Sequence, residues 1–219
     1  DPEGRIRALN TVIYLHEGIR YDHSPDARSR QEYYFLNGIL DTKRGICYTM
    51  PLLYMAVAQR LGYPIYPVAA PDHLFLRYAS YGFREQNIEA TSGGKYIPDA
   101  TYIRNFAVSQ RGLESGSYLR TLSYREFLGY LLGANAVIQA RRRVTPATLA
   151  LLEKAAELDP KTADHYDRLY TAHLEMSQRS QGKSAEGYRK KAIHYARKAR
   201  ELGYVHPDEI TQARRIRGQ

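Results

Sequence analysis

The sequence predicts an α+β core followed by an all-helical tail, and three observations support this fold class. An apolar segment from Cys47 to Leu61 indicates a helix that is buried on every side. The segments after Gly62 are apolar and of strand length, which predicts a small antiparallel sheet. Beyond Arg143 every apolar pattern has helical spacing. We therefore expect a core domain over residues 1–142 and a helical region over residues 143–219.

The sequence of the first half of the core predicts three helices. Apolar residues at helical spacing predict an amphipathic helix over Ile6–Ile19, and a shorter helix is expected over Gln31–Leu40. The central buried helix must begin within a few residues of Cys47, because Pro51 is tolerated only in a first turn. Gly62 is typical of a residue that ends such a helix.

The second half of the core contains the sheet and two further helices. A short helix is expected over Pro98–Phe106, and a Gly- and Ser-rich loop is expected up to Ser117. Ser123 and Glu126 have capping-box spacing, which predicts a long helix that continues to about Ala140. The three predicted strands are Ile65–Ala70, Leu74–Tyr78 and Phe83–Ala90.

The tail is predicted to consist of helices, the first with Thr145 as its N-cap and Pro146 at its first position. Two further helices are expected over Thr162–Ser177 and Ser184–Leu202. The segments 153–160 and 196–203 resemble each other, and both resemble the closing helix of a tetratricopeptide repeat. Their matching Glu-Leu pairs, at 157–158 and 201–202, lie 44 residues apart, whereas that repeat has a period of about 34 residues. We therefore expect helical hairpins of repeat type with an irregular period.

Composition excludes several classes of protein. With 43% hydrophobic and 25% charged residues the chain can bury a full core, which excludes a disordered or fibrous protein. The longest apolar runs fall short of the roughly 18–20 residues that a bilayer requires, so no membrane span is expected. The chain begins without Met or a leader, and we expect that an upstream segment was removed. A soluble protein is expected, and whether it is cytoplasmic or periplasmic stays open.

The basic character is concentrated in the tail, where residues 141–219 carry +7 of the net charge of +9. The runs Arg141–Arg143 and Arg189–Lys191 are typical of solvated helix faces, which disfavours nucleic acid as a partner. The sequence contains no Gly-rich phosphate loop and no His-Glu-x-x-His motif, and its seven His residues show no metal-ligand spacing. We therefore expect neither a cofactor nor a metal.

Cys47, the single cysteine, excludes an intrachain disulfide and is the candidate nucleophile. The start of a helix stabilises a thiolate through its unpaired amides and its dipole. Lys43 and Arg44 are expected to add positive charge beside it, and Gly45 is expected to let another segment approach closely. The alternative is a packed and inert thiol.

His73 and Glu89 are the candidate base and orienting acid. If residues 80–82 form a three-residue hairpin loop, residues whose numbers sum to 162 face each other, which places His73 opposite Glu89. Side chains that face each other in this way are close enough for the carboxylate to orient the imidazole. A slip of one residue would put them on opposite faces of the sheet. A surface histidine and a solvated strand carboxylate are the alternatives.

These motifs resemble the transglutaminase-like superfamily over roughly Glu32–Gly94. The resemblance is carried by Gly45-Ile46-Cys47 before an apolar helix, by Val68–His73, and by Asn87–Thr91 before two glycines. It implies a papain-like triad in which Cys47 is the nucleophile, His73 the base and Glu89 the orienting acid. It is closest to a bacterial branch that has a short core and a repeat-type tail.

The resemblance implies a cysteine hydrolase or acyltransferase, of peptidase, amidase or transglutaminase type. We expect a protein or peptide substrate that the helical tail recruits. The alternatives are a non-catalytic protein-binding scaffold and, less favoured, a basic nucleic-acid adaptor. An oxyanion hole would use the Cys47 amide and a second donor, for which Tyr33, Tyr34 and Asn37 are candidates.

Overall fold

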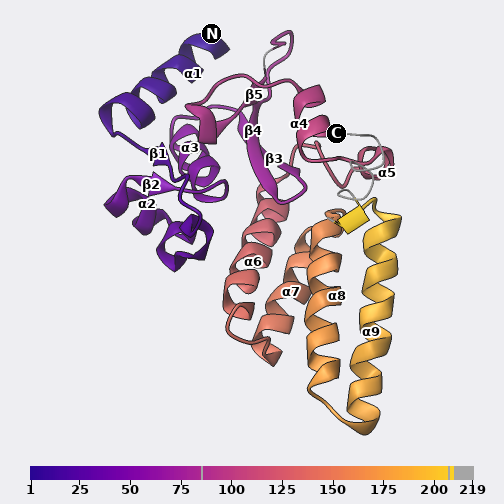
Figure 1. Cartoon of the computed structure of the whole chain (residues 1–219). Coiled ribbons are helices and arrows are strands. Elements are labelled where there is room, and N and C mark those ends of the chain that lie inside the picture. The colour runs from indigo at the N-terminus through magenta and orange to yellow at the C-terminus, as the bar shows by residue number, and fades with distance from the viewer. Residues whose placement is uncertain (85, 207, 210–219) are drawn as a thin grey trace. The chain divides into compact units, whose positions relative to one another are not determined.

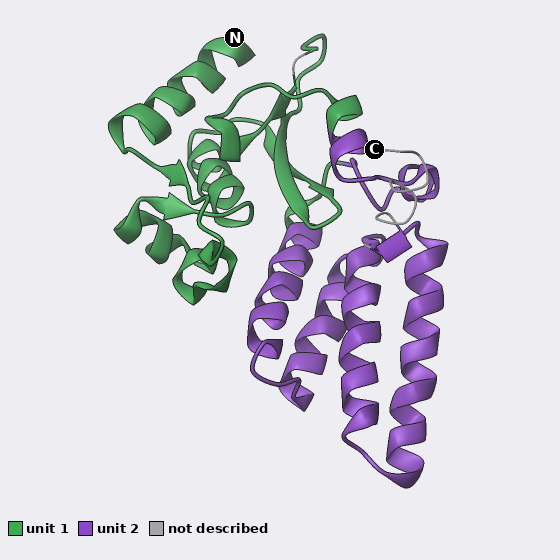
Figure 2. Ribbon diagram, in the orientation of Figure 1, with its two compact units in different colours: residues 1–101, 121–124 green, residues 102–120, 125–219 purple. Residues whose placement is uncertain are grey.

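The computed structural model describes residues 1–84, 86–206 and 208–209. The chain divides into two compact units, residues 1–101 with 121–124 and residues 102–120 with 125–219 (Figure 2). Unit 1 combines helices with a small antiparallel sheet, and the elements of unit 2 are helices (Figure 1), which confirms the predicted α+β class. The predicted domain boundary between residues 142 and 143 stays a prediction.

Unit 1 begins with helix α1 (Pro2–Asn10), which continues into a π-helical segment at Thr11–His16. The helix predicted over Ile6–Ile19 therefore starts four residues earlier and ends at His16. Its start is fixed by Asp1, whose side chain accepts a hydrogen bond from the Gly4 amide at 2.6 Å. The buried side chains of this stretch, Leu9 and Ile13, lie four residues apart on one face.

The helix predicted over Gln31–Leu40 is wrong as a single element. A 3₁₀ turn at Gln31–Tyr34 is followed by an extended Phe35 (φ −127°, ψ 149°) and then by helix α2 (Leu36–Thr42). The chain folds back so tightly here that a Cβ on Gly38 would lie 1.9 Å from a main-chain oxygen of the preceding turn. Such a contact requires glycine, so the break in the helix is built into the sequence.

Helix α3 (Thr49–Arg60) is the predicted central helix, and Met50, Tyr54, Met55 and Ala58 on it are buried. Pro51 lies in the first turn, as its missing amide hydrogen requires. The helix ends where Gly62 adopts a left-handed conformation (φ 67°). The next amide, that of Tyr63, donates to the carbonyl of Ala58 at 2.9 Å, which satisfies an otherwise unpaired group.

The sheet has the order β3-β4-β5 and is antiparallel throughout. Strands β3 (Ile65–Ala70) and β4 (His73–Tyr78) pair along their whole length, joined by a turn in which Asp72 has a φ of 48°. Strand β5 contains only Asn87–Ile88.

The predicted third strand over Phe83–Ala90 is therefore wrong in length, and the predicted register is wrong by two residues. Leu76 pairs with Ile88, whereas a three-residue hairpin loop would have paired it with Gln86. The loop is longer than expected and closes where the amide of Tyr78 donates to the carbonyl of Gln86 at 2.7 Å. A shift of two residues keeps every side chain on its predicted face.

Unit 2 contains four longer helices that share one hydrophobic core, together with the short α5 (Gln110–Glu114). Helix α5 lies where a loop was predicted. At the first helix of the tail, Thr145 is the N-cap and Pro146 follows it, as predicted. The four longer helices are α6 (Tyr124–Ala140), α7 (Pro146–Leu158), α8 (Ala163–Gln178) and α9 (Gly182–Glu201). Helices α7, α8 and α9 run side by side in Figure 1. Helix α4 (Asp99–Asn105) spans the division between the units.

Candidate active site

Cys47 lies two residues before helix α3, at the helix start as the sequence predicted, and only 1% of its surface is exposed. The turn around it is already wound, because the Met50 amide donates to the Ile46 carbonyl at 3.0 Å. The hydroxyl of Thr49 accepts a hydrogen bond from the Ile46 amide and donates to the carbonyl of Tyr33 at 2.8 Å. Cys47 is therefore held at the amino end of a buried helix, where the dipole favours an anion.

A short parallel pair of strands brings a distant segment beside Cys47. Strand β1 (Arg20–Tyr21) pairs with β2 (Arg44–Gly45), and the Asp22 amide donates to the Gly45 carbonyl at 2.9 Å. As the sequence predicted, another segment approaches Gly45 closely: a Cβ at this position would lie 2.5 Å from the side chain of Ile39. The loop that follows β1 is thus anchored two residues from the thiol.

His73 and Glu89 form a buried pair. The Nε2 atom of His73 lies 2.8 Å from Oε2 of Glu89, and the two residues are 7% and 3% exposed. The other carboxylate oxygen, Oε1, accepts hydrogen bonds from the amide (3.0 Å) and hydroxyl (2.6 Å) of Thr91. In the observed register the two side chains are diagonal neighbours on one face of the sheet and still meet, because both are long enough to span that distance.

The charges of this group are coupled. Burial lowers the pKa of His73, but the hydrogen bonds that its ring donates to Cys47 and Glu89, together with their negative charges, outweigh burial and raise the pKa to about 9. Burial opposes ionisation of Glu89, and its hydrogen bonds to His73 and Thr91 nevertheless lower its pKa. Because Nε2 of the imidazole is engaged by Glu89, Nδ1 is the ring nitrogen that can exchange a proton with the thiol.

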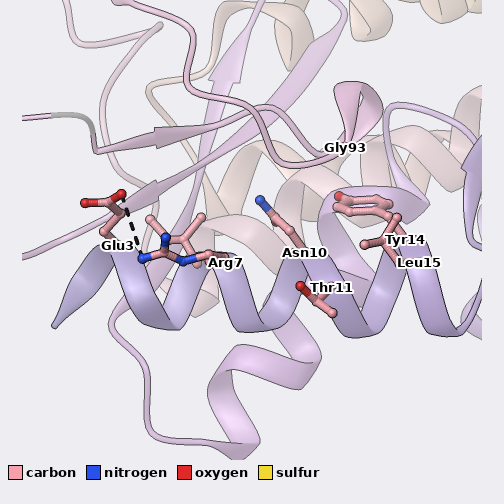
Figure 3. Close-up of a pocket in the computed structure, with 8 residues that line it drawn as sticks. Glu3, Arg7, Asn10, Thr11, Tyr14, Leu15 and Gly93 are labelled. Atoms are coloured by element: carbon pink, nitrogen blue, oxygen red, sulfur yellow. Dashed lines mark ion pairs between the residues drawn. The ribbon is translucent and has the colours of Figure 1, made fainter.

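The segment that carries Glu89 is fixed by the first helix. The side-chain amide of Asn10 donates to the Gly94 carbonyl at 3.2 Å, and the hydroxyl of Tyr14 donates to the Ala90 carbonyl at 2.9 Å. Figure 3 shows both side chains on the face of the helix toward the loop at Gly93, where a cavity of about 470 Å³ opens. The sequence had not indicated this support, since it depends on contacts more than 70 residues apart.

Arg28 is a further residue that the sequence analysis missed. Its Nη2 atom donates to Sγ of Cys47 at 3.8 Å. Lys43, which was expected to supply positive charge to the thiol, instead forms an ion pair with Glu17 at 2.8 Å. The cation beside the sulfur therefore comes from a loop far from Cys47 in the sequence.

Neither a metal centre nor a membrane helix emerges from the part of the chain that the structure describes. Within residues 1–84, 86–206 and 208–209, no group of three or more His, Cys, Asp or Glu side chains could hold a metal ion. Over the same ranges no helix is both long and apolar enough to cross a bilayer.

Comparison with known proteins shows a match to one protein family. The family model described as the transglutaminase-like superfamily matches residues 1–133, more than half of the chain. F-box only protein 21 of Mus musculus is 35% identical over 81 residues, which cover 35% of this chain and 12% of that protein. The Homo sapiens protein of the same name is 34% identical over 78 residues, or 33% and 12%. The chain thus spans about an eighth of these relatives. No solved structure gives a significant match.

Proposed function

Because this chain belongs to the transglutaminase-like superfamily, we propose that it is a thiol-dependent acyl-transfer enzyme that acts on amides or esters of a protein or peptide. The observation that carries this proposal is the chain of hydrogen bonds that links Cys47 to His73 and His73 to Glu89. A nucleophile beside a base, with the base oriented by a third group, is the arrangement that covalent acyl transfer requires.

In the proposed reaction the Cys47 thiolate attacks the acyl carbon, and the carbonyl electron pair moves to oxygen. The imidazolium of His73 then protonates the leaving amine or alcohol as the bond to the acyl carbon breaks, which leaves a thioester. Water or a second amine attacks the thioester, His73 takes its proton, and Cys47 is released. Glu89 keeps the imidazole oriented and stabilises its charged form through both steps.

The pH dependence of Cys47 alkylation by iodoacetamide tests this proposal, because a single thiol gives an unambiguous signal. We expect fast labelling below about pH 7, since His73 holds its proton there and supplies a positive charge to the thiolate. Cys47→Ser provides the unlabelled baseline. Labelling that rises only near about pH 8.5, as for an ordinary thiol, would contradict the proposal and favour the non-catalytic scaffold.

The substrate class is proposed from the helical tail. A cavity of about 530 Å³ on α8 and α9 is bordered by Ile193, Arg197 and Arg200, and Ile193 is 66% exposed. An apolar side chain beside two guanidinium groups fits a peptide segment that pairs an apolar residue with carboxylates. This surface supports recruitment of a protein or peptide substrate, independently of the chemistry at Cys47.

Ile193→Asp combined with Arg197→Glu is expected to lower kcat/KM for peptides at least tenfold, because it removes the apolar contact and reverses one charge. The measurement is the turnover of a tryptic peptide pool from casein, followed by mass spectrometry. Acylation by p-nitrophenyl acetate, which needs no docking surface, should stay unchanged. The matched control is Arg189→Glu, a charge reversal on the same helix outside the cavity. Equal peptide turnover in both variants would rule out this surface as the docking site.

A further inference from the structure

A guanidinium lies directly against the proposed nucleophile. The sulfur of Cys47 belongs to a residue that is almost fully buried, whereas Arg28 is exposed. Arg28 thus reaches the thiol from the solvent side, at 3.8 Å from Nη2 to Sγ. A carbonyl group that attaches to the sulfur from solvent has to come close to this guanidinium.

The loop that carries Arg28 has a defined conformation. The main-chain carbonyl of Arg28 accepts a hydrogen bond from the hydroxyl of Tyr34 at 2.9 Å, and the neighbouring Ala27 is buried. Earlier in the loop, the Asp22 carboxylate accepts hydrogen bonds from the Ser24 amide and from the Tyr33 hydroxyl, both at 2.8 Å. These bonds fix the backbone of the loop, and hence the position from which the arginine side chain extends.

The three donors that the sequence suggested for an oxyanion hole are placed differently. The Tyr33 hydroxyl donates to Asp22, and the Tyr34 hydroxyl donates to the main chain of Arg28. Asn37 lies exposed on α2. The Arg28 guanidinium, by contrast, contacts the sulfur of Cys47.

We propose that Arg28 is the second oxyanion donor, acting with the backbone amide of Cys47; this inference rests on the proposed acyl-transfer function. When the sulfur–carbon bond forms, the carbonyl π electrons move to the oxygen. The negative charge thus passes from the sulfur to the carbonyl oxygen, which is bonded to the carbon that the sulfur attacked. A donor that lies 3.8 Å from the sulfur can reach the roughly 2.7–3.1 Å that an oxyanion requires. The electron pair on the oxygen re-forms the carbonyl double bond as the leaving group departs with the electron pair of its bond to carbon.

The electrostatics of the loop support this role. The negative charge of Cys47 is the largest influence on the pKa of the Arg28 guanidinium, and it raises that pKa. Partial burial lowers the pKa. Three further residues add to the rise, namely Tyr21, Tyr48 and Asp72. Arg28 therefore stays charged throughout the reaction. A preformed cation of this kind needs no reorganisation when the charge develops on the oxygen.

The test compares two reactions of Cys47 in the whole chain. Acylation by p-nitrophenyl acetate forms an oxyanion, whereas alkylation by iodoacetamide displaces iodide and forms none. In Arg28→Gln we expect acylation to fall at least tenfold, while alkylation, measured on its high-pH plateau, changes less than threefold. Arg28→Lys keeps the charge but loses the forked donor, so its ratio of acylation to alkylation should also fall. Arg30→Gln, in the same loop but paired with Asp26, is the matched control and should leave both rates unchanged.

Each outcome decides the proposal. A lower ratio of acylation to alkylation in both Arg28 variants supports it. A parallel fall in both reactions would show that Arg28 affects the reactivity or access of the thiolate in general and not the oxyanion, and unchanged rates would show that it affects neither; both results overturn it. A wild-type protein that is alkylated no faster than free cysteine and is not acylated would instead refute the proposed function itself.

Discussion

His73→Ala is expected to slow the acylation of Cys47 by p-nitrophenyl acetate at pH 6 roughly a thousandfold, within the range of about 10²–10⁴ that general acid–base catalysis contributes. In the wild type the buried imidazole is hydrogen-bonded to Glu89, and its pKa of about 9 keeps it charged at pH 6. The variant removes this charge from beside the sulfur. An isolated thiol, with a pKa of about 8.5, is then mostly protonated and unreactive at that pH.

The measurement is the burst of p-nitrophenolate between pH 5 and 10, with iodoacetamide labelling in parallel. Since deprotonation at high pH replaces the missing imidazole, the deficit of His73→Ala should shrink as the pH approaches 10. His165→Ala is the control, because His165 is also buried but lies on α8 in the other unit. A His73→Ala protein that folds normally and reacts at the wild-type rate at pH 6 would exclude His73 as the base.

Local signals explain why much of the fold could be predicted. Strand β3 (Ile65–Ala70) has the predicted bounds, because an apolar run between Pro64 and Pro71 leaves little freedom. The N-cap at Thr145 was recognisable from its own side chain and from the proline after it. A strand boundary or helix cap of this kind depends only on neighbouring residues, so it can be predicted from the sequence alone.

The hairpin register shows where local reasoning failed without misplacing the site. The length of the loop after Tyr78 decides which residues face each other, and the Ser80-Tyr81-Gly82 turn signal did not determine that length. The error was two residues, which preserves the alternation of faces. His73 and Glu89 therefore meet as diagonal neighbours, although they were predicted to be directly opposed.

Arg28 could not be predicted, for a different reason. Its position depends on two paired residues in each of two strands, Arg20–Tyr21 and Arg44–Gly45, which are too short to produce a recognisable pattern. The charges adjacent to Cys47 in the sequence suggested Lys43 instead, and this lysine pairs with Glu17. Proximity in sequence was a poor guide where the chain turns sharply, since Lys43 itself has a φ of 55°.

Glu89→Gln is expected to lower the pKa of His73 from about 9, and to slow acylation near pH 7 roughly a hundredfold. Glutamine keeps the size of the side chain and an oxygen that can accept from Thr91, but it removes the negative charge. Cys47 is then the partner that still opposes burial, which disfavours the charged form of the imidazole. At neutral pH a larger fraction of the variant than of the wild type would hold a neutral histidine.

Stability should depend less on pH in Glu89→Gln than in the wild type. In the wild type the folded state binds the His73 proton more tightly than the unfolded chain does. This stabilisation is fully present below about pH 6.5 and is lost as the pH rises through about 9, and it is at most about 3 kcal/mol. The Glu89→Gln protein, in which the His73 pKa is lower, should lose less stability over the same pH range. Urea unfolding at pH 6 and pH 9 measures the difference, and NMR titration of the His73 ring assigns it.

The comparison of the two unfolding curves also separates an electrostatic role of Glu89 from simple packing. If Glu89 only fills space, Glu89→Gln would lower the free energy of unfolding by the same amount at pH 6 and pH 9. If its charge holds the imidazolium, the loss is concentrated at pH 6, where the wild-type ion pair is intact. Thr91→Val, which removes one hydrogen bond to Oε1 but leaves the carboxylate charge, should show a smaller effect of the same sign. Equal losses at both pH values would contradict a charged His73–Glu89 pair.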